Sequence, residues 1–358
     1  MKNIFEGLRV LDLSTVLAGP SVATFFAELG AEVVKIENPG NGGDVTRSWK
    51  LKSEEQYSNI SAYFSSVNYN KKYLWLNIAE KDNRQALEKL IAESDIVIIN
   101  FKTGDDVKFK LTPAIVRAIN PKIVYAKITG FDSNPERVAY DVVLQAETGY
   151  MHMNGTSESG PIKMPVAIMD VLAAHQLKEG ILCALLRREK TGIGCVVECS
   201  LEKAGLSALV NQATNFLMAN HIPQRAGSLH PNISPYGETF TCLDGKQIVL
   251  AVGSDKQFRQ MCYLLGDSNL SEEDEFATNQ QRVINRAMLA SRLKPLFEQK
   301  AVGEWINIFV EHHIPAGAIK SMDEVMQNNI AKEMILDEII DGRITRRMAS
   351  AAFTITPY

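Results

Sequence analysis

Apolar and polar positions follow two rhythms at the start of the chain. Residues 8–13 form an apolar run of strand length, and residues 21–29 carry apolar positions at helical spacing that end at Gly30, a residue favoured just after a helix. Residues 31–37 form a second apolar run. Strand, helix and strand within about 30 residues predict a right-handed βαβ unit of a parallel sheet.

The same alternation continues to about residue 219. Further strands are predicted at residues 73–78, 95–101, 122–128 and 195–200, and further helices at 81–94, 112–120, 168–190 and 201–219. Strands that alternate with helices in this way indicate an α/β domain with helices on both faces of the sheet.

The pattern changes from about residue 226. Pro, Asn and Gly cluster over residues 227–238, and two short strands are predicted at 239–241 and 247–252 around a turn. Helical patterns follow at 255–265, 279–299 and 302–312. This part of the sequence predicts a smaller α+β domain.

Composition excludes several classes of protein. The chain has 358 residues, of which 46% are apolar and 22% charged, so it is not a disordered chain. Its net charge is -4, and no basic excess indicates a nucleic-acid partner. Its apolar stretches are too short or too interrupted to cross a bilayer, so no membrane partner is expected.

The first residues and the cysteines bear on the compartment. The opening MKNIFEGLRV has no uninterrupted apolar core, so no secretory signal is expected. An odd, scattered set of five cysteines favours reduced thiols and a cytoplasmic protein, and gives no ligand spacing typical of a metal site. These are Cys183, Cys195, Cys199, Cys242 and Cys262.

The first βαβ unit lacks the glycine signature of a dinucleotide site. Its turn reads STVLAGPSVATF, with Gly19 alone, although Glu37 ends the second strand where a ribose-binding acid would stand. Without further glycines the backbone cannot approach a pyrophosphate in the usual way, so a nicotinamide or flavin site is not expected.

Asp170 heads a long apolar helical pattern, and the residues alone leave two interpretations open. Asp is favoured as an N-cap, which is a purely structural role. A carboxylate at a helix start also suits a covalent nucleophile that accepts an acyl group from an activated ester. Tyr140 is either a substrate-contacting phenol or an ordinary half-buried aromatic, and lysines near the strand ends, such as Lys71, are either solvated or phosphate-binding.

Several motifs in order resemble class III coenzyme A transferases, the family of formyl-CoA transferase, carnitine CoA-transferase and α-methylacyl-CoA racemase. The opening GLRVLDLSTVLAGPSVATFFAELGAEVVKIENPGNGGDVTR is similar to the family's start. The segments NFK at 100–102, ITGF at 128–131, RREKTGIG at 187–194 and HPN at 230–232 resemble further family segments in order and spacing.

The resemblance implies roles for individual residues. Asp170 stands at the family's nucleophile, which passes through a mixed anhydride to an aspartyl-CoA thioester, with no metal required. Tyr140 stands where transferases commonly have Tyr and racemases have His, so it implies a positioning group and CoA transfer. The implied CoA contacts are Val16, Leu17 and Ala18 on the first loop, and Asn100, Phe101, Lys102 and Lys108 on another.

Two departures from formyl-CoA transferase change the expected substrate. That enzyme has Gln where this chain has Leu17, and its glycine-rich flap has no counterpart over residues 226–238. An oxalate or formate enzyme is therefore not expected. An acyl-CoA racemase or isomerase on the same fold, and a noncatalytic CoA-binding relative, stay open as alternatives.

The resemblance also implies the domain plan and the assembly. We expect a Rossmann-like, parallel-sheet large domain over residues 1–200, rejoined by about 330–358, and a small α+β domain over 226–325, with linkers at 201–225 and 326–330. An interlocked homodimer is expected. The expected substrates are an acyl-CoA donor, with coenzyme A as the carried group, and a small carboxylic acid acceptor.

Overall fold

The computed structural model describes residues 4–356 of the chain, which form two compact units. The first unit takes in the chain up to Met151, Lys163–Pro223 and the residues from Ile330 onward. The second takes in His152–Ile162 and Gln224–Asn329. That these units fold as separate domains with the boundaries given above stays a prediction.

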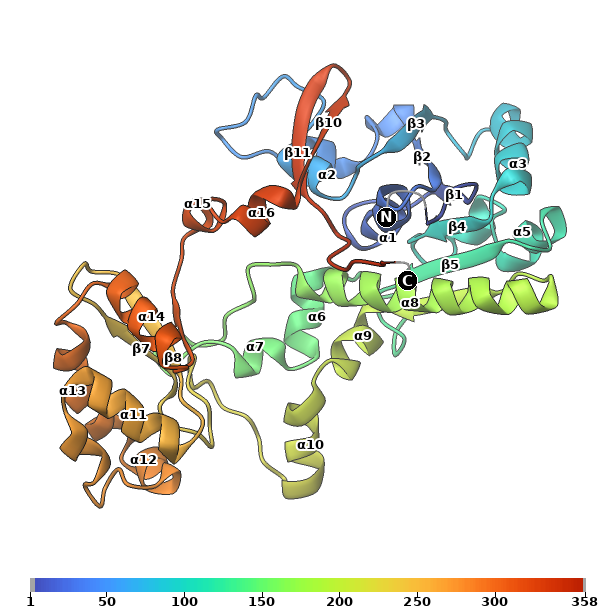
Figure 1. The fold of residues 1–358 in the computed structure, drawn as a ribbon. Helices are drawn as coiled ribbons and strands as arrows, with labels where there is room; N and C mark the ends of the chain where they lie inside the picture. Colours follow the sequence, from blue (N-terminus) through green and yellow to red (C-terminus); the bar gives the residue numbers. More distant parts are fainter. Residues whose placement is uncertain (1–3, 357–358) are drawn as a thin grey trace. The chain divides into compact units, whose positions relative to one another are not determined.

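A six-stranded parallel sheet is the centre of the first unit (Figure 1). Its strands lie in the order β3-β2-β1-β4-β5-β6, and every neighbouring pair is parallel. The order reverses between β1 and β4, which makes this the topological switch point of a doubly wound sheet. The strands are β1 (Arg9–Asp12), β2 (Glu32–Glu37), β3 (Lys71–Trp75), β4 (Ile96–Ile99), β5 (Val124–Thr129) and β6 (Val196–Ser200).

Helices cover both faces of this sheet because the strands are apolar on both sides. In β4, Ile96 and Ile98 pack into one core, whereas Val97 and Ile99 pack into the other. The first core contains α1 (Ala18–Glu28), α8 (Ile168–Thr191) and α9 (Leu201–Ser207). The second contains α3 (Arg84–Glu93) and α5 (Pro113–Ile119).

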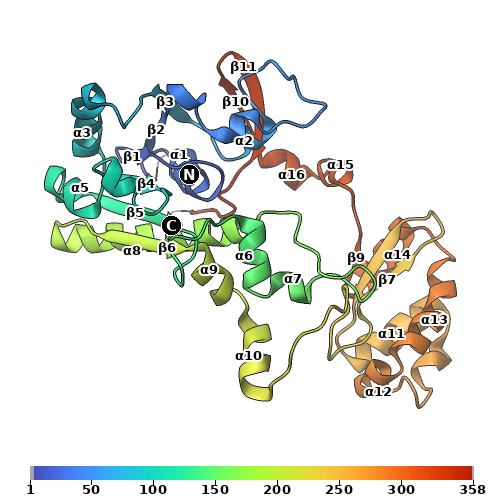
Figure 2. The same cartoon turned by 180° about the vertical axis from the view of Figure 1, so that it is seen from behind.

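The remaining elements of the first unit are short helices and one hairpin. The strands β10 (Ile335–Ile340) and β11 (Arg343–Met348) form an antiparallel pair, and β11 packs beside α2 (Ala62–Ser66), as both views show (Figures 1 and 2). The other helices that lie wholly or partly in this unit are α4 (Asp105–Lys108), α6 (Asp141–Glu147), α7 (Tyr150–Met153), α10 (Val210–Ala219) and α16 (Asn329–Glu333).

The hairpin is fastened to α1 by Glu28. Its carboxylate accepts an ion-paired hydrogen bond from Arg347 of β11, and it also accepts the backbone N–H and the hydroxyl of Ser350. Only 4% of the Glu28 side chain is exposed, so this is a buried ion pair with several donors.

The second unit is an antiparallel sheet with helices packed on it. The strands are β7 (Tyr236–Thr241), β8 (Gln247–Ala251) and β9 (Ala316–Ala318), in the order β7-β8-β9. The helices are α11 (Asp255–Leu265), α12 (Asn279–Ile284), α13 (Arg286–Phe297), α14 (Val302–Glu311) and α15 (Met322–Val325). Phe297 is central to the core, where it stacks on Phe240 at 4.7 Å between ring centroids and meets Trp305 edge-on.

The structure corrects several predicted elements. The helix expected over 201–219 is two helices, because the chain turns at residues 208–209 and Val210 has a φ of 38°. The helix expected over 279–299 is likewise two, with Asn285 between α12 and α13. The strands β9, β10 and β11 were not predicted. No helix within residues 4–356 combines the length and the apolar content that a bilayer crossing requires.

Four charged side chains are buried beneath the carboxyl end of β1. Lys71 lies 2.9 Å from Asp12, and Lys35 lies 3.8 Å from Asp12 and 3.2 Å from Asp44. All four side chains are fully buried. Burial acts to raise the pKa of Asp12, but Lys35 and Lys71 outweigh it and hold this pKa below its usual value. Lys71 is therefore neither solvated nor available to a phosphate.

We expect the Asp12→Ala variant to lose about 3–5 kcal/mol of the free energy of unfolding, because two buried lysines would lose their shared partner. Urea denaturation followed by circular dichroism measures this loss.

Glu32 provides the matched control, because it also meets two cations, Arg9 and Lys72, but at the surface. The Glu32→Ala variant should lose less than about 1 kcal/mol. Equal losses in the two variants would contradict the importance of the buried cluster.

Candidate active site

Asp170 stands in the first turn of α8, and its carboxylate has no partner among the described residues. The residue before this helix is Ala167, and no side chain of its own segment caps it. Within residues 4–356, the Asp170 carboxylate takes part in no hydrogen bond or ion pair, so its interpretation as an N-cap is wrong. A carboxylate that is mostly buried and unpartnered costs folding free energy, which favours a chemical role.

Asp141 performs the capping that Asp170 does not. It is the first residue of α6, and its carboxylate accepts the backbone N–H of Met169 at 2.7 Å and the side-chain amide of Gln145 at 2.6 Å. Gln145 is fully buried and in turn accepts the backbone N–H of Met164 at 2.7 Å. This network fixes the first turn of α8 and thereby the position of Asp170.

The environment of Asp170 makes its charged form costly. Burial, followed by the negative charge of Asp141, raises the pKa of Asp170 from 3.8 to about 7. A group with this pKa is divided between its acid and its carboxylate at neutral pH, as a catalytic carboxylate that must be desolvated can be.

Tyr63 on α2 belongs to the same neighbourhood and was not predicted from the sequence. Burial, followed by the charges of Asp170, Asp141 and Asp44, raises the pKa of Tyr63 to about 12. Its phenol therefore stays protonated and can donate a hydrogen bond. The ring of Trp49 meets it edge-on at 5.0 Å between centroids. A sequence signal for Tyr63 is lacking, because it lies in a long connection between β2 and β3 with no regular pattern.

The site lies at the carboxyl edge of the sheet. At the far end of α8, Arg188 pairs with Asp95, which directly precedes β4, so that end lies at the amino edge. A 24-residue helix is long enough to cross the sheet, and its first turn therefore reaches the carboxyl edge. Ligands of open α/β sheets bind at this edge, beside the switch point.

The first loop predicted to contact CoA lies at the switch point. Val16 and Leu17 are partly exposed between β1 and α1, whereas the side chain of Ala18 is buried in the core and leaves only its backbone available. Val16 has a φ of 72°, an unusual conformation for a β-branched residue. Position 19 has room only for Gly, because a Cβ there would lie 2.3 Å from the Ser14 side chain.

The second predicted loop follows β4 and is tied to the first. The Asn100 side chain accepts the N–H of Thr15 at 3.0 Å and donates to the Thr15 carbonyl at 2.7 Å. Phe101 packs edge-on against Phe109, while Lys102 and Lys108 are exposed to solvent. The structure thus brings both loops together at the switch point and explains Asn100 as the residue that joins them.

Tyr140 directly precedes α6, beside the Asp141 that holds α8. Its side chain is 58% exposed and makes no interaction within the described part of the chain, which leaves the phenol free for a ligand. Within those residues there is also no group of three or more His, Cys, Asp or Glu side chains arranged to hold a metal ion.

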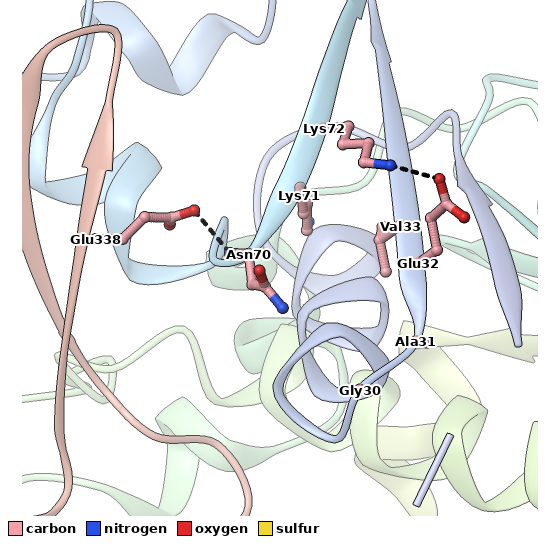
Figure 3. Close-up of a pocket in the computed structure, with 8 residues that line it drawn as sticks. All are labelled: Gly30, Ala31, Glu32, Val33, Asn70, Lys71, Lys72 and Glu338. Carbon is pink, nitrogen blue, oxygen red and sulfur yellow. Dashed lines mark hydrogen bonds and ion pairs between the residues drawn. The ribbon is translucent and has the colours of Figure 1, made fainter. Parts of the chain in front are cut away.

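A separate hollow lies at the amino end of β2 and β3, away from Asp170 (Figure 3). There Glu338 of β10 accepts the backbone N–H of Asn70 at 3.0 Å, and Lys72 pairs with Glu32. The remaining lining residues are Gly30, Ala31, Val33 and Lys71. Lys72 pairs with Glu32 and Lys71 with Asp12, so both lysines of this hollow already have an anionic partner.

Comparison with known proteins identifies the family. Residues 5–355 match the family model described as CoA-transferase family III, so the chain belongs to this family of enzymes, as the sequence motifs indicated. Curated relatives of the chain are named CoA-transferases, which favours CoA transfer over the racemase and the noncatalytic alternatives.

Two curated relatives and one solved structure are similar over most of their length. The chain is 32% identical to the succinate–glutarate CoA-transferase of Agrobacterium fabrum, over 90% of this chain and 82% of that protein. It is also 32% identical to human succinyl-CoA:glutarate CoA-transferase, over 93% of this chain and 77% of that protein. The crystal structure of a CaiB/BaiF family protein from Brucella suis is 32% identical, with a TM-score of 0.87 over 99% and 93% of the two chains.

We expect the Asp170→Asn variant to be more stable than wild type above neutral pH. The unfolded chain releases the Asp170 proton near pH 4 and the folded chain near pH 7, so wild-type stability falls as pH rises through this window. At pH 8 the variant should gain about 1–3 kcal/mol in the free energy of unfolding. Below pH 4 both proteins are uncharged at this position and the gain disappears.

Urea denaturation at a series of pH values measures this difference. Glu189→Gln, at an exposed position of the same helix, is the control and should change stability by less than about 0.5 kcal/mol. A variant that is less stable than wild type at pH 8 would show that the carboxylate has a stabilising partner.

Proposed function

We propose that this chain transfers CoA from an acyl-CoA thioester to a small carboxylic acid, with Asp170 as the covalent carrier. The observation that carries this proposal is the unpartnered Asp170 carboxylate, fixed in the first turn of α8 by Asp141. A structural carboxylate would be paired or would cap the helix, and this one does neither.

The first half of the reaction makes the carrier. The Asp170 carboxylate attacks the thioester carbonyl, the C–S bond breaks, and CoA leaves as a thiolate while a mixed anhydride forms. The thiolate then attacks the aspartyl carbonyl and the donor acid leaves as a carboxylate. Asp170 now holds CoA as an aspartyl thioester.

The second half repeats these steps in reverse with the acceptor. Its carboxylate attacks the aspartyl thioester and expels the CoA thiolate, which then attacks the acceptor's acyl carbonyl and frees Asp170. One thioester is consumed and one is formed, so the exchange needs no ATP. Asp170 attacks only in its ionised form, so the rate should rise with pH through about 7.

Other side chains have proposed roles around the carrier. The protonated Tyr63 donates a hydrogen bond to an oxygen of the reacting acyl group, and the exposed Tyr140 positions the acid. Val16, Leu17 and the Ala18 backbone lie along CoA, with Asn100 and Phe101 beside them. The exposed Lys102 and Lys108 supply positive charge to its phosphates.

The relatives suggest the class of acid. Both curated relatives described above are named for succinate and glutarate, which are short dicarboxylic acids. We propose a short dicarboxylic acid as acceptor here. The apolar Leu17 fits a methylene chain better than the two adjacent carboxyl groups of oxalate.

The proposed assembly is a homodimer. No residue of α10 is buried, although several of its side chains are large and apolar. Val210, Leu217 and Met218 are 67%, 78% and 84% exposed. A second copy of the chain that covers this apolar helix would remove it from water. Free cysteines suit a reducing compartment, and the cytoplasm is the proposed location.

We expect the Asp170→Ala variant to lose transfer activity by about a thousandfold or more, because the covalent carrier is gone, while CoA binding is kept. Mass spectrometry of a panel of acyl-CoA donors and dicarboxylic acids measures transfer. Hydroxylamine added during wild-type turnover should leave a hydroxamate on the peptide that contains Asp170. Full turnover of the variant, or a hydroxamate on another residue, would sink the proposed mechanism.

The Leu217→Glu variant should shift the protein from the mass of two chains toward one, because a charge in the covered face opposes association. Light scattering measures the mass. Met322→Glu places the same charge at a position of α15 that is 70% exposed and should leave the mass unchanged. A wild-type mass of a single folded chain would exclude the dimer.

A further inference from the structure

We infer that Asp44 is a positioning residue for the reaction, because it holds the loop between β1 and α1 in the conformation that receives the acyl-CoA. This inference rests on the proposed function, which places CoA along that loop. Asp44 itself lies in the connection between β2 and β3 and does not touch the reacting atoms in this proposal.

Three consecutive backbone N–H groups of the loop are each held by a side chain from a different segment. Ser14 donates to Asp12 at 3.0 Å, and Thr15 donates to Asn100 at 3.0 Å. Val16 donates to both carboxylate oxygens of Asp44, at 3.3 and 3.4 Å. The path of the loop is thus fixed by side chains rather than by regular secondary structure.

Val16 is the residue that most needs such a hold. Its φ of 72° lies in the left-handed region, which Gly occupies readily and β-branched residues avoid. Backbone conformations of this kind persist only where the surroundings impose them, and they cluster at functional sites. Because Leu17 follows and leads into α1, the conformation of Val16 also sets where that helix begins.

Asp44 is itself held rigidly. Its side chain is fully buried, it pairs with Lys35 at 3.2 Å, and it accepts the backbone N–H and hydroxyl of Thr46 at 3.0 and 2.8 Å. Its own backbone N–H donates to Glu37 at 2.8 Å. The Asp44 carboxylate is therefore fixed in place by the buried cluster, and it in turn fixes the backbone N–H of Val16.

Asp44 also influences the Asp170 side of the site. It is one of the three carboxylates whose negative charge acts on Tyr63, together with Asp170 and Asp141. One buried carboxylate thus reaches both the loop proposed to carry CoA and the phenol proposed to act beside the carrier.

The test compares CoA binding in Asp44→Ser, Val16→Gly and the double variant, measured by calorimetry with coenzyme A itself. Ser keeps an acceptor for Thr46 but is too short to hold Val16, so we expect CoA to bind about tenfold or more weakly. The value of kcat at saturating substrate should fall less than the affinity does, because Asp44 does not touch the reacting atoms. The affinity of Val16→Gly is the reference for the double variant, because Val16 itself lies along CoA in the proposed function.

Rescue is the decisive measurement. Gly adopts a positive φ without being forced, so the double variant should recover binding to within about threefold of Val16→Gly. If Asp44 were merely structural, Asp44→Ser would lower stability without weakening CoA binding by the folded protein, and Val16→Gly would rescue nothing. Either of those results overturns the inference.

Asp95→Ser is the matched control, because Asp95 also accepts a backbone N–H, that of Arg9 at 2.8 Å, but at the amino edge of the sheet. It should bind CoA as wild type does. If Asp44→Ser does not fold, Val16→Pro removes both the N–H and the positive φ while Asp44 stays in place, and it should show the same loss. Unchanged binding there refutes the inference.

The two proposals fail in different ways. A wild-type protein that does not bind CoA would end both. A wild-type protein that binds and transfers CoA, with equally tight binding in Asp44→Ser, would end only the role of Asp44.

Discussion

Charge buried beneath the first strand is the constraint on which the sheet and its switch point depend. The cluster joins three adjacent strands, because it takes Asp12 from β1, Lys35 from β2 and Lys71 from β3. Asp44 adds the connection between β2 and β3. Ionised groups in such a place are tolerated only while every one of them is partnered. The Lys35 ammonium also donates to the Ser14 carbonyl at 2.7 Å, which extends the cluster into the loop at the switch point.

Asp170, the proposed carrier, is in the opposite situation. Asp12 and Asp44 have cations close by, whereas among the described residues the only charge that acts on Asp170 is the negative Asp141. The charge of Asp170 thus destabilises the fold, whereas the charges of Asp12 and Asp44 are compensated by cations. Such a division is common where a side chain must react, because a nucleophile that is fully satisfied by its own protein has little tendency to attack a substrate.

Much of the large sheet could be predicted from the sequence, because buried parallel strands are apolar runs separated by helical patterns. The strand over 95–101 and the helix over 168–190 are examples, seen as β4 and α8. The break at residues 208–209 and the hairpin of β10 and β11 were missed. A positive φ at Val210 has no signature when the residue is not Gly, and β10 and β11 alternate only weakly.

The site was predictable only in part. Asp170 stood out because a carboxylate interrupts an apolar pattern, and the family motifs gave it a role. The parts played by Asp141, Tyr63 and Asp44 depend on contacts between segments distant in sequence, such as the bond from Met169 to Asp141. Lys71 was open to the wrong interpretation for the same reason, since its partner Asp12 lies 59 residues away.

The ion pair between Glu28 and Arg347 of the hairpin links segments from near the two ends of the described chain. Arg347 lies 319 residues after the glutamate that binds it, and the whole second unit is inserted between them. During synthesis on the ribosome, this ion pair cannot form until nearly every other described residue has been added. We therefore expect the nascent first unit to stay incomplete for most of translation, while the intervening unit already has its full sequence and can fold ahead of it.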